Sequence, residues 1–504
     1  MNLIHVLILA VYPLLISNVS ASAVLLETSI SQDGKLERAR KLLASSPEQE
    51  VRDGARICVE LNSVASVEEL LNVLNLTANR GLAAAHYRDV CWEALRDITD
   101  PYARKRVEQE LKENKGSERV RQWCAELLGL YAGNEFGESL TKALGDKSDD
   151  VRAAAARALG RIKYTQAQKG LLKRIKSKDT VLRANAIEAL ALIDPTANEK
   201  TYLKGLEDKD GGVRCALYAI ALVAYPDQAE ALSTTALDDD DWRPRLQGCD
   251  NLAGIKTKTA VDALLEAFDD ERAVVVVRAI SSLQKLTHQK LTRADQWKKW
   301  WERSRETFDF PEGRIDIVRA DPNATVSVFN GIRLDSGHVA FLLDKSAKMG
   351  DFLSSRDMSK DDAAHEELKG VLDALQGELV FNIFCYDIRV RPFSEKGSVK
   401  LTKTTAKKAL AFHEKAPISG RKDIWAALMA VLEDPKLDTA YLLSSGEPDI
   451  GLYVHWPRVT YQLKELNRFH KVVFHTVAYS DSEWDRSQLE KIAEATGGEF
   501  QWFE

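Results

Sequence analysis

The first half of the chain repeats one arrangement of polar and apolar positions. An arginine follows each short polar stretch, and a mostly small side chain three residues later and an apolar one seven residues later share one helix face. The arginines are Arg52, Arg88, Arg121, Arg152, Arg183, Arg214 and Arg245, and the last four steps between them are each 31 residues long. A fixed period of this size indicates stacked helix pairs, so the pattern predicts an all-α solenoid over residues 35–305.

Helix starts can be predicted within these repeats. In five of them the position four residues before the arginine holds a serine or an aspartate, side chains that cap a helix by accepting a backbone N–H. We expect this role for Ser117, Ser148, Asp179, Asp210 and Asp241.

The segment SDDVRAAAARALG, residues 148–160, carries the pattern most clearly. It resembles the D…VR…AA…LG signature of HEAT-like (armadillo-type) repeats. The resemblance implies a helical solenoid that most often serves as a binding scaffold. Some HEAT-like proteins are lyase or isomerase subunits acting on bilin chromophores, so an enzyme subunit is an alternative.

The repeated arginines have two interpretations. They could form a basic stripe for an acidic ligand, or an internal ladder in which each guanidinium bonds carboxylates and carbonyls of adjacent repeats. The fixed fork of an arginine suits the ladder, and most repeats have an acidic residue nearby. We therefore predict an internal ladder.

The cysteines follow the repeat as well. Cys91 and Cys124 occupy equivalent positions in adjacent repeats, which places their backbones about 8–10 Å apart. A disulfide needs Cα atoms closer than about 7 Å. Cys58, Cys215 and Cys249 sit at other offsets of the same helices. These positions predict buried free thiols.

Three tryptophans follow the last repeat. Trp297, Trp300 and Trp301 have the i, i+3, i+4 spacing of one helix face. Such a stripe could stack on sugars, but it more often covers the exposed end of a core, so we expect a cap on the solenoid.

From Val326 onward the pattern changes to short apolar runs separated by helix-like segments. The Asn330-Gly331 pair between two β-prone runs predicts a hairpin. Strands are predicted at 338–344, 379–387, 439–445 and 471–479, and helices at 360–376, 404–416, 423–434 and 486–498. This alternation predicts an α/β doubly wound, mainly parallel sheet that binds ligands at the carboxyl ends of its strands.

The sequence of this second part, residues 326–504, resembles the von Willebrand factor type A domain, a Rossmann-like fold. The resemblance is carried by FNGIRLDSGHVAFLLDKSAKM, GRKDIWAAL, LLSSGEPDIG and LEKIAEATGGEFQWF. The chain is therefore expected to be multidomain, with a HEAT-like solenoid followed by a type A domain.

The type A resemblance implies a metal site, but this chain departs from it. The family uses D-x-S-x-S, then a threonine, then an aspartate. Asp344 and Ser346 keep their positions, while the others are Lys348, Lys422 and Ser445. An ammonium about 5 Å from a dication costs roughly 6–7 kcal/mol at an effective dielectric constant of about 20, before screening. We expect the shell of a metal site, with a lysine in place of the ion.

Composition narrows the function. The 504 residues carry a net charge of −6 with both signs interspersed, which argues against nucleic acid as a partner. The nine histidines lack ligand spacing, and no serine or cysteine lies in a nucleophile motif, so we predict no catalytic residue, cofactor or metal. The expected function is non-enzymatic protein–protein interaction. The alternative within binding proteins is metal-dependent adhesion through an irregular Mg²⁺ or Ca²⁺ site.

The N-terminus predicts export. Residues 3–16 are apolar, and Ala21-Ser22-Ala23 has the form of a signal-peptide cleavage site. An uncleaved anchor is the alternative, although about 14 apolar residues are short for a membrane span of about 20. The expected domains are a signal peptide (1–23), a linker (24–34), the solenoid with its Trp-rich cap (35–305), a linker (306–325) and the type A domain (326–504).

We predict that the mature protein begins near Val24 and carries six free thiols. The small-residue cleavage site and the cysteine offsets are the physical reasons. Intact mass of the exported protein under non-reducing conditions measures both properties. A mass lower by two protons per cysteine pair would contradict the thiol prediction, and retention of residues 1–23 would contradict cleavage.

Overall fold

The computed structural model describes residues 31–77, 84–113, 117–131, 133–313, 315–318, 327–375 and 379–504. The expected signal peptide lies outside these ranges. The Ser31 hydroxyl accepts the N–H of Gly34, so helical structure begins at Gln32, inside the segment 24–34 that was expected to be a linker.

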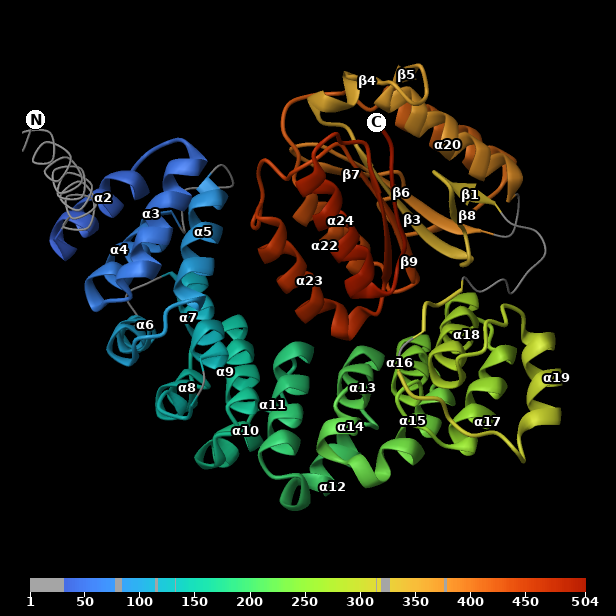
Figure 1. Cartoon of the computed structure of the whole chain (residues 1–504), viewed down its shortest axis with the longest axis horizontal. Helices are drawn as coiled ribbons and strands as arrows, with labels where there is room; N and C mark the ends of the chain where they lie inside the picture. The colour runs from blue at the N-terminus through green and yellow to red at the C-terminus, as the bar shows by residue number, and fades with distance from the viewer. Residues whose placement is uncertain are drawn as a thin grey trace, which may run out of the picture.

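The first part of the chain is an all-helical repeat solenoid that curves through an arc (Figure 1). Its α-helices are α2 (Gln32–Leu43), α3 (Glu48–Leu61), α4 (Val64–Thr77), α5 (Ala85–Arg96), α6 (Pro101–Glu113), α7 (Glu118–Leu130), α8 (Gly137–Ala143), α9 (Asp149–Arg161), α10 (Gln168–Leu172), α11 (Thr180–Ile193), α12 (Pro195–Gly205), α13 (Gly211–Tyr218), α14 (Ala221–Ala224), α15 (Ala229–Leu237), α16 (Trp242–Leu252), α17 (Lys258–Glu266), α18 (Ala273–Thr287) and α19 (Ala294–Ser304).

The predicted helix caps are confirmed. Five side chains accept N–H groups of the first helical turn, each at the start of the helix that carries the repeat arginine: Ser117, Ser148, Asp179, Asp210 and Asp241. These bonds satisfy donors that a helix start otherwise leaves without partners.

The arginine ladder is internal in most repeats, as predicted, whereas Arg52 pairs with Glu48 of its own helix and Arg88 donates to the carbonyl oxygens of Thr77 and Gly451. Four arginines donate through Nε and Nη2 to the carboxylate of an aspartate 25 residues later, in the pairs Arg121–Asp146, Arg183–Asp208, Arg214–Asp239 and Arg245–Asp270. Asp208 and Asp239 also accept the Nη1 of the next arginine through their carbonyl oxygens. One aspartate thus joins two successive repeats.

The cysteine and tryptophan predictions are also confirmed. All six cysteines are free and buried. Trp297 and Trp301 of α19 are 0% and 3% exposed, and Phe308 packs edge-on against Trp301 at 5.6 Å between ring centroids. They close the core of the last repeats.

The second part of the chain is an α/β domain. Its strands are β1 (Val328–Phe329), β2 (Ile332–Arg333), β3 (His338–Asp344), β4 (Phe352–Leu353), β5 (Met358–Ser359), β6 (Val380–Tyr386), β7 (Val390–Pro392), β8 (Val399–Lys400), β9 (Thr439–Ser444), β10 (Val473–Ala478) and β11 (Phe500–Trp502). Its helices are α20 (Lys360–Ala374), α21 (Lys403–Lys415), α22 (Ile424–Leu432), α23 (Trp456–His470) and α24 (Glu483–Thr496).

The main sheet has the order β11-β10-β9-β3-β6-β7, with β8 also paired to β6. β3, β6, β9, β10 and β11 are parallel to one another. β7 and β8 each pair antiparallel with β6. Alternate residues of β3 point to opposite faces, so Phe341 packs with α20 and α21 while Leu342 packs with α22, α23 and α24. The predicted hairpin is present, with Asn330 and Gly331 at φ 50° and 77°.

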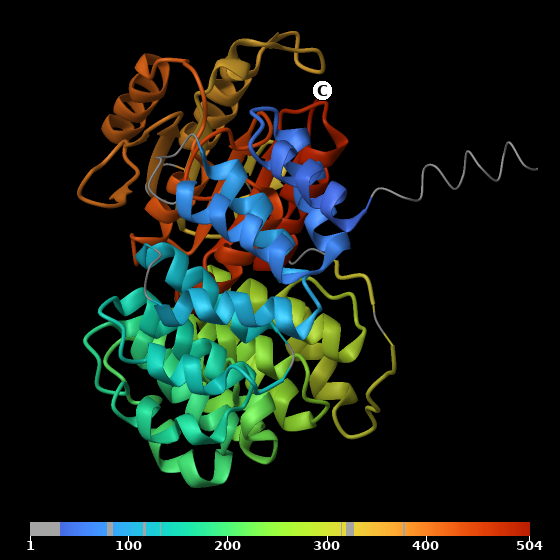
Figure 2. The ribbon, with the colours of Figure 1, turned by 90° about the vertical axis from the view of Figure 1, so that its left-hand side faces the viewer.

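The α/β domain lies within the concave side of the solenoid (Figures 1 and 2). Its helix α23 faces the inner helices of the repeats, and the apolar cluster of the first repeats continues into the domain through α22, α23 and α24. Trp92 of α5 contacts Tyr461 of α23 at 5.4 Å between ring centroids. Within the described residues, no helix is long and apolar enough to cross a membrane.

Candidate functional site

Asp344 ends the central strand β3 and is completely buried. Its Oδ1 accepts the N–H of Ser346 at 2.7 Å, and its Oδ2 accepts both the N–H and the hydroxyl of Ser445, at 2.9 and 2.6 Å. The hydroxyls of Ser346 and Ser445 lie 3.3 Å apart. The loops after β3 and β9 therefore converge on one carboxylate at the carboxyl edge of the sheet.

The Lys422 side chain enters the same shell from the loop before α22. Its Nζ lies 3.5 Å from Oδ2 of Asp344 and donates to the Ser445 hydroxyl at 3.0 Å. Lys422 is 0% exposed, so the pair is screened little by solvent. A buried carboxylate is thus neutralised by a buried ammonium.

Lys348 takes a different position. It lies in the turn after β3, is exposed, and has no hydrogen bond or ion pair through its side chain with any described residue. Of the two lysines expected near Asp344, only Lys422 enters the shell.

The residues of this shell do not fit a divalent metal. Mg²⁺ and Ca²⁺ need several oxygen ligands that include carboxylates, whereas the shell supplies one carboxylate, two hydroxyls and an ammonium. The Lys422 ammonium lies where it would repel a dication. Elsewhere in the described part of the chain, no group of three or more His, Cys, Asp or Glu side chains is arranged to hold a metal.

A cleft of about 320 Å³ lies beside the shell, between its loops and the first repeats. Lys348 and Arg421 contribute exposed cations, while Glu447 and Asp449 contribute carboxylates. Burial raises the pKa of Glu447 above its usual range. The cleft is formed by both domains and carries both charges.

The α23 helix fastens the α/β domain to successive repeats by ion pairs. Arg458, only 1% exposed, donates to Glu126 of α7 at 3.0 Å and stacks 3.4 Å over the Trp92 ring. Glu465 accepts from Arg161 of α9 at 2.7 Å. A buried arginine with both a carboxylate and an aromatic face is strongly held.

The pairing continues toward the end of α23. Arg468 donates to Glu188 of α11 at 2.7 Å. Burial alone would raise the pKa of Glu188, but the attraction of its arginine partners is stronger and lowers it. Lys471 donates to Asp250 of α16 at 3.0 Å. Successive charges on and just after one helix therefore meet successive repeats.

His455 joins the two domains at the N-terminal end of α23. Its Nε2 and Nδ1 lie 3.1 and 3.2 Å from carboxylate oxygens of Glu48 and Glu93. Burial opposes a charge on His455, but the bonds to both glutamates outweigh it and raise its pKa to about 9. Asp89 accepts the backbone N–H groups of Val454 and His455, and burial raises the pKa of its carboxyl to about 6.

The sequence pattern did not lead us to predict α23 or its role. Pro457 in the first helical turn and the apolar spacing of Val459, Leu463 and Leu466 were available signals. Lys345 was also missed: it is fully buried beside Asp344 and donates to Asp361 of α20 at 2.7 Å.

Comparison with known sequences identifies the repeats. Residues 105–191 and 169–247 match the family of HEAT repeats. The solenoid therefore contains HEAT repeats, a class that suggests a scaffold for protein interaction. No curated protein sequence matches the chain significantly.

Solved structures resemble parts of the chain only distantly. The complex of CpcE and CpcF of phycocyanin lyase from Nostoc is 19% identical, covers 42% of this chain and 87% of that chain, and has a TM-score of 0.28. A von Willebrand factor type A structure from Catenulispora acidiphila is 17% identical, with coverages of 34% and 40% and a TM-score of 0.28. YibA from E. coli is 19% identical, with coverages of 48% and 86% and a TM-score of 0.33. These scores carry no functional argument.

The His455 contact predicts a loss of stability at alkaline pH. Its folded pKa of about 9 exceeds the unfolded value of about 6.5, so its contribution is complete below about pH 6.5 and is lost as pH rises through about 9. We expect His455→Gln to remove roughly 2–3 kcal/mol of this pH-dependent stability. Urea unfolding of the full chain at several pH values between 6.5 and 9 measures it.

His288→Asn is the matched control, because an asparagine also tolerates the left-handed backbone of residue 288 at φ 59°. The control should keep the wild-type slope. If His455→Gln keeps that slope too, the His455 contact is not the source of the pH dependence.

Proposed function

We propose that this protein is an exported, non-enzymatic scaffold. In it, HEAT repeats hold a von Willebrand factor A-like domain whose metal site has been replaced by a lysine, and the carboxyl edge of the sheet binds a protein partner. The single observation that carries the proposal is the buried Lys422 ammonium, 3.5 Å from Asp344 and 3.0 Å from Ser445. Export rests on the apolar N-terminal segment and the Ala21-Ser22-Ala23 site.

The partner surface is proposed on the rim around the shell. Ile388 and Ile418 are 47% and 41% exposed, and Ile388 lies beside Gly420 in the loop that carries Lys422. Lys348 and Arg421 add exposed cations on the same side. Exposed apolar side chains next to exposed cations favour a partner that presents apolar and acidic residues.

Two alternative functions predict different experimental results. A metal-dependent adhesion protein would be stabilised by Mg²⁺ or Ca²⁺ despite the irregular shell. An enzyme subunit of the HEAT-like lyase type would retain a bilin chromophore, which a visible absorption band of the purified protein would reveal.

The shell itself gives a stability prediction. Asp344→Ala leaves the Lys422 ammonium buried without its carboxylate, so we expect a loss of roughly 3–5 kcal/mol in the free energy of unfolding. Asp373→Ala, at an exposed position of α20, is the matched control and should change stability by less than about 0.5 kcal/mol. Added Mg²⁺, Mn²⁺ or Ca²⁺ should leave the wild-type melting temperature unchanged, since an ion that does not bind the native state adds no stability.

Restoring the oxygen ligands should reverse this behaviour. The triple substitution Lys348→Ser, Lys422→Thr and Ser445→Asp removes two cations and adds one carboxylate. Its melting temperature should rise with millimolar Mg²⁺. A magnesium-induced rise in the unmodified protein would instead support metal-dependent adhesion.

Partner binding can be tested on the rim. Full-length protein is cross-linked in envelope extracts of the source organism, beside the double variant Lys348→Glu/Arg421→Glu and the control Lys369→Glu on α20. We expect the same protein to be recovered with wild type and control, and recovery to fall at least about tenfold with the double variant, because two attractive charges become repulsive. Equal recovery with all three would place the partner surface elsewhere.

A further inference from the structure

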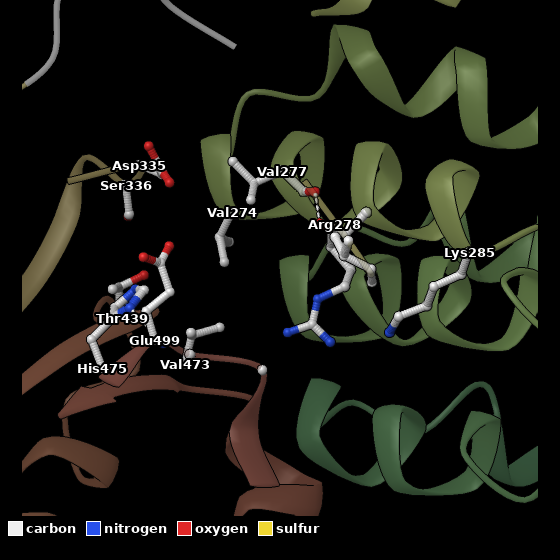
Figure 3. A pocket seen from close by; sticks show the side chains of 14 residues that line it. Val274, Val277, Arg278, Lys285, Asp335, Ser336, Thr439, Val473, His475 and Glu499 are labelled. Atoms are coloured by element: carbon white, nitrogen blue, oxygen red, sulfur yellow. Dashed lines mark hydrogen bonds between the residues drawn. The ribbon is translucent and has the colours of Figure 1, made fainter. Parts of the chain in front are cut away.

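A second cavity, of about 480 Å³, lies at the opposite edge of the sheet (Figure 3). It is bounded by α18 of the solenoid and by the first residues of β9 and β10, Thr439 and Val473. Ligand pockets commonly have volumes of about 300–1,000 Å³ and often form where two domains meet. Its size and position are therefore those of a small-molecule site.

The two walls of this cavity carry opposite charge (Figure 3). Arg278 and Lys285 project from α18 on one side. Asp335, which also lies 3.6 Å from Nε of Arg333, and Glu499 come from the α/β domain on the other. Lys285 has no hydrogen-bond or ion-pair partner among the residues that the structure describes. Its ammonium is available to an anionic group of a ligand.

The position of Arg278 is fixed by the surrounding structure. It donates to Asp250 at 2.6 Å and to the carbonyl of Thr496 at 3.3 Å. A side chain at Gly497 would place its Cβ 2.5 Å from Nη2 of Arg278, and this glycine has a φ of +79°, which most residues avoid. The guanidinium is thus held at the rim by both domains.

Apolar side chains lie between the charged walls. Val274 and Val277 of α18 and Val473 of β10 line the middle of the cavity (Figure 3). Ile317, 41% exposed, also lines the cavity. A ligand that fits this lining has an apolar body with an anionic group at one end and a cationic group at the other.

We propose that this cavity binds a short apolar peptide as its zwitterion. The terminal carboxylate is bound by Lys285 and Arg278, the terminal ammonium by Glu499 and Asp335, and the apolar side chains by the valines. The site is independent of the Asp344 shell, because it lies at the other ends of the strands.

The test is calorimetric titration of the full-length protein with dileucine and trialanine at neutral pH. We expect saturable one-to-one binding of at least one of them. N-acetyl and C-amide forms of the same peptide should bind at least about tenfold more weakly, since each loses a charge-assisted contact. Absence of binding by both peptides, or equal binding of a blocked form, would overturn the proposal.

Substitutions locate the binding to this cavity. Lys285→Ala should lower the affinity for the unblocked peptide about tenfold or more. Glu499→Gln should lower the affinity for the unblocked peptide but not for its N-acetyl form. Lys290→Ala, at an exposed lysine just after α18, is the control and should bind as wild type. Melting temperatures show that each variant is folded. Wild-type affinity in Lys285→Ala would overturn the assignment.

Discussion

The charge pairing along α23 is the constraint on which the rest of the molecule depends. Arg458, Glu465 and Arg468 are buried or half-buried, and their partners lie on three successive inner helices of the solenoid. Charges removed from water are stable only with partners, so the α/β domain has one position in which all three are satisfied. That position forms both the cleft beside the Asp344 shell and the cavity at α18, because each has walls from both domains.

The seating of the domain also changes how the solenoid is used. Concave surfaces of helical repeats are extended binding surfaces, and here that surface contacts the protein's own α/β domain. The concave surface is therefore occupied by the protein's own domain, and we have proposed the rim of the sheet as the surface for outside partners. An internal ammonium in the shell makes the proposed docking face independent of the concentration of divalent ions.

Local features were predictable from the sequence because they depend on neighbours one repeat away. The caps at Ser148 and Asp179 and the pair Arg183–Asp208 follow from a fixed period. The type A resemblance implied that Asp344, Ser346 and Ser445 lie together, and they do. The resemblance left open which lysine is buried there, because that depends on how the loops before α22 and after β3 fold. The role of α23 could not be predicted from the local sequence, because the partners of its charges, such as Glu126 for Arg458, lie hundreds of residues away.

The geometry of α23 restricts how such a protein can change in length. Repeat proteins commonly gain or lose units, since each unit contacts only its neighbours. Here α23, a single helix of 15 residues, forms ion pairs with α7, α9 and α11, so the spacing of these three helices must match the spacing of the charges on α23. A repeat inserted between these helices would move the following ion-pair partners away from their charges on α23. A repeat added beyond α19 would leave these pairs in place. The number of repeats is therefore fixed where α23 contacts the solenoid, although the sequence is built of repeated units.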